Sequence, residues 1–224
     1  MPARAAASRS LNFSLARSKV QGRTTRLNVS ARGPRGPPTM VPNVQVDGQM
    51  MDVMGYLKSN RIIFIGEPIT DKVVQSVITD MLALELADPN ADIKLYLNSP
   101  EGTIHSIIAL VDMMKLVKCD VSTVAFGMCG GLSAVILASG TKGKRYSMPN
   151  TRILLHQPMG GAQGSAYEVN IQAKELARGF KMVCTWYSDI TGMSPDELME
   201  ELDRDNFMSP TKAVELGFID GVIE

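Results

Sequence analysis

The residues best suited to chemistry lie in two glycine-containing turns, residues 98–102 (NSPEG) and 127–131 (GMCGG). Each turn follows a short apolar stretch that predicts a strand and precedes a stretch with helical spacing. A turn that enters a helix presents free backbone N–H groups at the positive end of the helix dipole. Such groups can stabilise a developing oxyanion. Spacing alone does not distinguish this role from that of two ordinary tight turns.

The elements that would position these turns alternate between strand and helix. Period-two and β-branched stretches predict strands at residues 61–65, 93–97, 121–126, 144–148, 152–155 and 218–223. Helical spacing, capping residues and stop signals predict helices at residues 71–87, 103–117, 132–139, 167–191 and 195–202, and another after Ser209. This alternation predicts an α/β fold with largely parallel strands, whose sites form at the carboxyl ends of the strands.

Charge is distributed unevenly, although the 224 residues contain 23 basic and 23 acidic side chains. Residues 1–46 contain eight Lys or Arg and no acidic residue, so residues 47–224 carry a net charge of −8. An acidic globular part argues against bulk nucleic-acid binding. No apolar run approaches the roughly 20 residues that a membrane span needs. We therefore expect neither nucleic acid nor a membrane as a partner.

Residues 1–38 are rich in Arg, Ser and Ala and contain no acid, which is typical of an organelle transit peptide that ends in a Gly-Pro linker. A disordered basic tail that binds RNA or a membrane surface is the alternative. We expect residues 1–38 to be removed, residues 39–52 to begin the mature chain, and residues 53–224 to form the folded domain.

The three cysteines, Cys119, Cys129 and Cys184, are odd in number and lack the CxxC spacing of a zinc site. We expect no metal site, no disulfide framework and no cofactor. Three free thiols suit a reducing compartment such as a plastid stroma.

Several motifs, in the same order and at compatible separations, resemble the proteolytic subunit of the Clp protease. These motifs are residues 93–102 (IKLYLNSPEG), 120–123 (DVST), 140–150 (GTKGKRYSMPN), 156–158 (HQP), 203–209 (DRDNFMS) and 213–217 (AVELG). The resemblance extends from about residue 52 to residue 224. It implies a crotonase-like, ClpP-like α/β head with a projecting handle and stacked seven-membered rings that enclose a proteolytic chamber. It also implies a Clp-type AAA+ ATPase that docks on the ring.

The resemblance further implies a Ser–His–Asp triad, of which this chain keeps two members. The histidine corresponds to His156 and the aspartate to Asp205, and the two could retain their hydrogen bond as a structural relic. Gly131 stands at the nucleophile position. The oxyanion-hole amides correspond to those of Gly102 and Leu132.

Glycine has no side chain, so Gly131 cannot attack a carbonyl, and loss of the nucleophile costs on the order of 10⁶ in kcat. Ser133 and Cys129 are the alternative nucleophiles. Successive helical residues advance by about 100°, which predicts that Ser133 points away from His156, and Cys129 would require a rebuilt turn. A second departure from the family pattern is Glu101, which replaces the first glycine of a Gly-Gly pair and puts the shape of that turn in question.

Nucleophile-lacking Clp homologues of cyanobacteria and plastids, called ClpR, assemble with active ClpP subunits, and the chain is similar to this branch. We therefore expect a non-catalytic structural subunit of a Clp core in the chloroplast stroma rather than the mitochondrion. Its expected partners are active ClpP, other ClpR subunits and the AAA+ ATPase. Two alternatives stay open. One is an active serine or cysteine peptidase that uses Ser133 or Cys129. The other is a crotonase-like acyl-CoA enzyme, which uses paired backbone amides and needs no serine.

Overall fold

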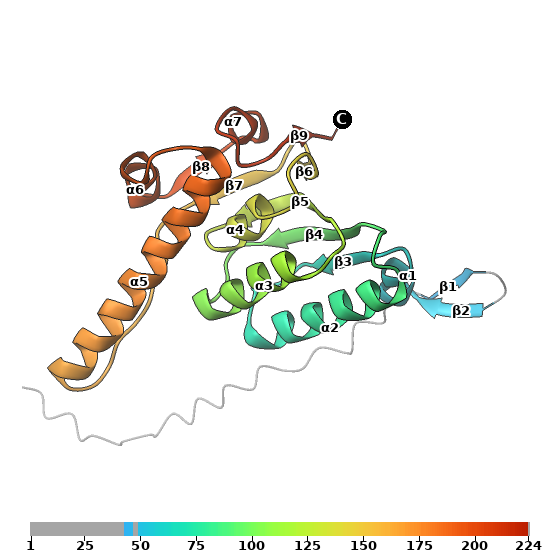
Figure 1. Ribbon diagram of the computed structural model, residues 1–224, viewed down its shortest axis with the longest axis horizontal. Helices are drawn as coiled ribbons and strands as arrows, with labels where there is room; N and C mark the ends of the chain where they lie inside the picture. Colours follow the sequence, from blue (N-terminus) through green and yellow to red (C-terminus); the bar gives the residue numbers. More distant parts are fainter. Residues whose placement is uncertain (1–42, 47–48, 224) are drawn as a thin grey trace, which may run out of the picture. The chain divides into compact units, whose positions relative to one another are not determined.

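The computed structural model describes residues 43–46 and 49–223 (Figure 1). The transit peptide and linker predicted at residues 1–38 lie outside the described residues, as do residues 39–42 of the predicted N-terminal segment. All elements named below belong to one unit of the chain, residues 41–224.

Seven strands of the described part of the chain form the central sheet. They are β3 (Ile62–Ile65), β4 (Ile93–Ser99), β5 (Val121–Gly130), β6 (Arg145–Ser147), β7 (Arg152–Leu155), β8 (Asn206–Met208) and β9 (Gly221–Val222). The order β3-β4-β5-β6-β9 is parallel throughout. The middle of β5 pairs with β6, the end of β5 pairs in parallel with β7, and β7 pairs antiparallel with β8. The predicted α/β fold with largely parallel strands is thus confirmed.

Helices connect these strands. The helices of the described residues are α1 (Val53–Ser59), α2 (Asp71–Ala87), α3 (Ile104–Leu116), α4 (Ser133–Ala138), α5 (Ala166–Thr191), α6 (Pro195–Asp203) and α7 (Pro210–Glu215). A hairpin of β1 (Asn43–Val46) and β2 (Gln49–Asp52) precedes α1. Figure 1 shows α2 and α3 side by side along the sheet, with α6 and α7 at the end where β7 and β8 lie. None of these helices is both long and apolar enough to cross a membrane.

The core lies between the sheet and the helices that cover it. In β4 the buried Ile93, Leu95 and Leu97 alternate with residues that are at least partly accessible, as expected for a strand whose successive side chains point to opposite faces. On α2 the buried side chains recur at helical spacing and are Val74, Val77 and Met81. The two periodicities therefore bury one continuous apolar cluster between α2, α3, α4 and the strands.

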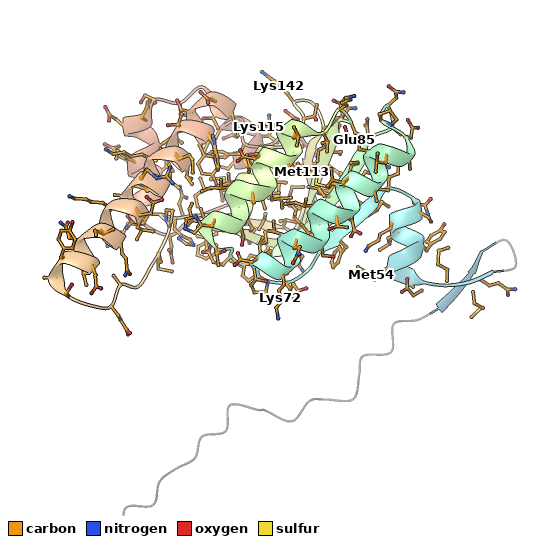
Figure 2. The ribbon with its side chains drawn as sticks, turned by 60° about the horizontal axis from the view of Figure 1, so that its bottom comes forward. Met54, Lys72, Glu85, Met113, Lys115 and Lys142 are labelled. Atoms are coloured by element: carbon orange, nitrogen blue, oxygen red, sulfur yellow. The ribbon has the colours of Figure 1, made fainter. Side chains whose placement is uncertain are left out.

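Residues near the end of α3 contact neighbouring elements. Figure 2 labels Met113 and Lys115 of α3 and Glu85 of α2. Met113 of α3 is buried, whereas the ammonium group of Lys115 lies 5.4 Å from the ring centroid of Trp186 in α5. The carboxylate of Glu85 in α2 accepts a hydrogen bond of 2.9 Å from the backbone N–H of Lys118. These contacts join α3 to α5, and α2 to the segment that follows α3.

The handle implied by the resemblance is α5. A capping box begins this helix, since Ser165 and Glu168 each bond the other's backbone N–H, and the left-handed Gly192 ends it. The first half of α5 is exposed and extends away from the sheet (Figure 1). The second half packs on the core through Gly179, Val183, Cys184 and Tyr187. The helix is therefore anchored at one end only.

Several elements differ from the sequence predictions. The third strand was expected to end at residue 126, but β5 continues to Gly130 and turns only at Gly131. The left-handed Gly127 (φ +57°) lies inside this strand, where the register with β4 shifts, so the glycines signalled a bulge there and not a turn. The hairpin, α1 and β8 were missed because they are short, and the last strand is only Gly221–Val222.

Candidate functional site

The site is built where the ends of β4 and β5 meet. Ser99 and Cys129 pair across the two strands, and the turn after β4 is fixed on its other side by Ile69. The N–H of Ile69 donates to the Glu101 carbonyl at 2.9 Å, and the Thr103 N–H donates to the Ile69 carbonyl at 3.0 Å. Backbone hydrogen bonds alone therefore hold residues 101–103 in place.

Glycines let the two turns approach closely. A Cβ on Gly130 would lie 2.5 Å from the carbonyl oxygen of Pro100, and a Cβ on Gly102 would lie 2.8 Å from the side chain of Ile107. Both distances are shorter than real Cβ contacts. Positions 102 and 130 therefore require glycine, because any larger residue would prevent the close approach of the two turns.

Gly131 links β5 to α4 in a strand-to-helix turn with φ +53°. Its N–H donates to the Leu154 carbonyl at 2.9 Å, which fixes the turn against β7. A Cβ built on Gly131 would lie 2.6 Å from Nε2 of His156 and 2.3 Å from Oε2 of Glu101. Position 131 is thus a sharp elbow whose side chain, if it had one, would point at the histidine, as a hydrolase nucleophile does.

Two backbone amides converge on one point beside Gly131. The N–H of Gly102 and the N–H of Leu132 both donate to Oε1 of Glu101, at 2.9 and 3.2 Å. These are the two amides that the resemblance assigned to an oxyanion hole. The structure brings them together, and it shows an oxygen of this chain already bound between them. We refer to the amides of Gly102 and Leu132 as the amide cradle.

His156 follows β7 and its side chain is only 10% exposed. Nε2 lies 2.9 Å from Oε2 of Glu101, and Nδ1 lies 2.8 Å from the carbonyl oxygen of Gln157. Each ring nitrogen therefore faces an acceptor oxygen. Nε2, the nitrogen that a side chain at position 131 would approach, is in contact with Glu101.

Asp205 does not orient His156 in the structure. The two residues line the same cavity of about 430 Å³, but Nδ1 of His156 bonds to Gln157 and no hydrogen bond to Asp205 is present among the described residues. Asp205 is exposed just before β8, and its side chain faces solvent. The relic His–Asp hydrogen bond considered from the resemblance is not formed.

The two alternative nucleophiles face the core. The hydroxyl of Ser133 is buried, and its single O–H lies within hydrogen-bonding distance of two carbonyl oxygens, that of Gly130 at 2.7 Å and that of Ser99 at 2.8 Å. Cys129 is also fully buried, with Sγ 3.5 Å from the Ser133 hydroxyl, and burial raises the pKa of its thiol to about 12. A protonated, solvent-excluded thiol is unreactive, so neither group is placed to attack a substrate.

Comparison with known proteins identifies the family. The model of the family described as Clp protease matches residues 45–224. The chain belongs to the Clp protease family. This Clp-family chain is also 45% identical, over 179 residues, to the Arabidopsis thaliana protein named "ATP-dependent Clp protease proteolytic subunit 4, chloroplastic". The matched region covers 80% of this chain but only 61% of that relative, so the chain spans less than two thirds of the relative's length.

Glu101 is the residue whose part in the site sequence reasoning missed. Its replacement of a family glycine was visible, but it suggested only a change in the shape of the turn. The signal that could have found it is the acidic side chain directly before a predicted cradle amide, because a glutamate is long enough to bond the N–H that follows it. The second amide comes from Leu132, 31 positions away in the sequence, and only the fold shows that it is within reach.

Proposed function

We propose that this Clp-family chain is a non-catalytic, ClpR-type subunit of an ATP-dependent Clp protease core. The observation that carries the proposal is the elbow at Gly131, where a nucleophile would face His156 and where this chain has no side chain. The burial of Ser133 and Cys129 supports it, because the alternative of a relocated nucleophile would require the core to open. Membership of the Clp family favours this function over the acyl-CoA alternative.

The physical role of such a subunit is to supply surface to an assembly. The exposed half of α5 and the loop before it carry large apolar side chains in water, among them Met159, Tyr167 and Ile171. Exposed apolar groups on a projecting element are typical of subunit contacts. We therefore propose that α5 packs between subunits, with active ClpP and other ClpR subunits as neighbours and a Clp-type AAA+ ATPase as the unfolding partner.

The proposed compartment is the chloroplast stroma. The name of the Arabidopsis relative includes the word chloroplastic, and the acid-free, Arg-rich residues 1–38 have the composition of a transit peptide. N-terminal sequencing of the protein isolated from plastids is expected to find a mature end after residue 38. A mature protein that still begins at Met1 would contradict this part of the proposal.

An active-site probe tests the central claim. The assembly that contains this chain is purified from its organelle, treated with a fluorophosphonate, and analysed by intact-subunit mass spectrometry. We expect adducts on co-purified active subunits, which serve as the internal positive control, and none on this chain. An adduct on any residue of this chain would contradict the non-catalytic assignment. Native mass spectrometry of the same sample identifies the neighbouring subunits and their stoichiometry.

A further inference from the structure

The carboxylate of Glu101 occupies the position that a substrate carbonyl oxygen would take. Oε1 accepts from both amides of the cradle, and Oε2 contacts Nε2 of His156 at 2.9 Å. We propose that Glu101 is an internal ligand that closes the amide cradle, so that this subunit cannot seat a peptide carbonyl there even if a nucleophile is supplied. This inference rests on the proposed function. It adds a second reason for inactivity, an occupied amide cradle, to the missing nucleophile.

The backbone of Glu101 is held so that its side chain reaches all three partners. Its carbonyl oxygen accepts from the Ile69 N–H at 2.9 Å and from the Ser99 hydroxyl at 3.0 Å. From this fixed point the side chain bonds the next residue in the chain, Gly102, and crosses to Leu132 in the facing turn. Hydrogen bonds from neutral donors to a carboxylate are stronger than those to a carbonyl oxygen. A peptide carbonyl therefore competes poorly with the charged group for the same two donors.

The carboxylate of Glu101 and a peptide carbonyl oxygen cannot both bind in the amide cradle. An oxyanion hole works when its donors lie about 2.7–3.1 Å from the oxygen that develops charge. The Gly102 and Leu132 amides already lie 2.9 and 3.2 Å from Oε1 of Glu101. Two oxygen atoms cannot occupy this point together. A substrate could enter only after the Glu101 side chain leaves, and leaving breaks the contact with His156 as well.

Restoring the nucleophile with and without Glu101 tests the inference. Gly131→Ser alone is expected to react with a fluorophosphonate no more than a few-fold above the wild-type chain, because the serine would meet the Glu101 carboxylate. Glu101→Gly with Gly131→Ser is expected to react about 10²–10³-fold faster than Gly131→Ser, the range that oxyanion-hole donors contribute. Glu67→Gly with Gly131→Ser is the matched control, since Glu67 is exposed and outside the site, and it should behave like Gly131→Ser. Equal labelling of all three variants would overturn the inference.

A second measurement does not depend on a rebuilt nucleophile. In the full chain, Glu101→Ala empties the cradle, whereas Glu101→Gln keeps an acceptor oxygen on a side chain of the same length. Hydrogen exchange at the Gly102 and Leu132 amides should be at least about tenfold faster in Glu101→Ala than in wild type, since each tenfold corresponds to about 1.4 kcal/mol, and Glu101→Gln should stay near wild type. An exchange rate in Glu101→Ala equal to that of wild type would overturn the inference. This holds even if none of the serine variants is labelled, so the exchange measurement decides that case.

The two proposals fail in different ways. Labelling of the wild-type chain at Ser133 or Cys129 would remove the non-catalytic assignment, and hydrogen exchange would still show whether Glu101 fills the cradle. Strong labelling of Gly131→Ser with an unlabelled wild-type chain would leave the non-catalytic assignment intact and remove the role of Glu101.

Discussion

Gly131→Ala is expected to destabilise the fold more than the same substitution at a glycine that also has a positive φ but has free space around it. Gly131 has φ +53°, and its Cβ would lie 2.3 Å from the Glu101 carboxylate and 2.6 Å from the His156 ring. Gly143 has φ +87°, and nothing lies within 4 Å of a Cβ built there. Gly143→Ala therefore measures the cost of a positive φ without a close contact, and most of the difference between the two variants reports the contact with Glu101 and His156.

The magnitudes follow from the contacts. A left-handed conformation costs a non-glycine residue about 1–2 kcal/mol, offset by about 0.4–1 kcal/mol because alanine stiffens the unfolded chain. Gly143→Ala is thus expected to cost about 1 kcal/mol. At Gly131 the Cβ must also displace the Glu101 carboxylate from its two amides. Hydrogen bonds to a charged group contribute about 1.5–3 kcal/mol when buried. Because the Glu101 side chain is 39% exposed, we discount the pair to about 2 kcal/mol, for a total near 3 kcal/mol.

Thermal unfolding at equal protein concentration gives the comparison. A difference of about 2 kcal/mol corresponds to about 4–8 °C in Tm for a chain of this size, so Gly131→Ala should melt that much below Gly143→Ala. In a Glu101→Ala background the extra cost should shrink, because the displaced carboxylate is absent and only the contact with His156 remains, and the two substitutions should be non-additive. Equal Tm losses for the two single variants, or full additivity in the double variant, would refute the reasoning.

Three further predictions concern buried polar groups. Arg145 donates two side-chain hydrogen bonds to Asp220 and lowers the pKa of its carboxyl. In urea unfolding at pH 7, Asp220→Asn should therefore lower the free energy of unfolding by about 3 kcal/mol, because it leaves a buried guanidinium without its carboxylate. The control Asp203→Asn, at an exposed position, should change the free energy of unfolding very little. A lowered carboxyl pKa stabilises the fold above the unfolded value of about 4, and this contribution is lost as the pH falls from there through the lower folded value. The difference in stability between wild type and Asp220→Asn should therefore narrow progressively below about pH 4; a constant difference would contradict the pairing. Cys129, with its thiol pKa near 12, should resist iodoacetamide at pH 8 until the chain is unfolded, and native alkylation found by peptide mass spectrometry would show that the core opens. Ser133→Ala should lower the free energy of unfolding by about 1–2 kcal/mol, because the buried carbonyls of Ser99 and Gly130 lose the O–H that lies between them. A variant as stable as wild type would mean that its hydroxyl is not buried as described.

The sequence was sufficient for the elements with strong periodic or capping signals. The helix predicted at residues 71–87 is α2 as observed, the strand at residues 152–155 is β7, and the capping box at Ser194 begins α6. These signals are local: apolar spacing, a serine three residues before a glutamate, and a proline at the first helical position. Local signals failed where tertiary pairing decides, as at β8, which has three residues and pairs with β7.

The candidate site was predictable in position and not in detail. Motif order located Gly102, Gly131, Leu132 and His156, and the structure brings all four around one point. The partner of each polar atom could not be predicted, because these residues come from three separate segments of the chain. The bond from His156 to the Gln157 carbonyl, in place of one to Asp205, depends on the path of the backbone after β7, and no residue spacing encodes that path.

The left-handed elbow at Gly131 has a consequence for the stability of the folded chain. A serine placed there for catalysis would hold a conformation that side chains adopt only at a cost of order 1–3 kcal/mol, as strained nucleophile turns do. Glycine adopts it freely, while the bond of its N–H to the Leu154 carbonyl keeps the turn in shape. Activity and thermal endurance are commonly traded against each other in enzymes. In the proposed assembly, a subunit with glycine at this elbow would lack a cutting site and would also avoid this backbone strain.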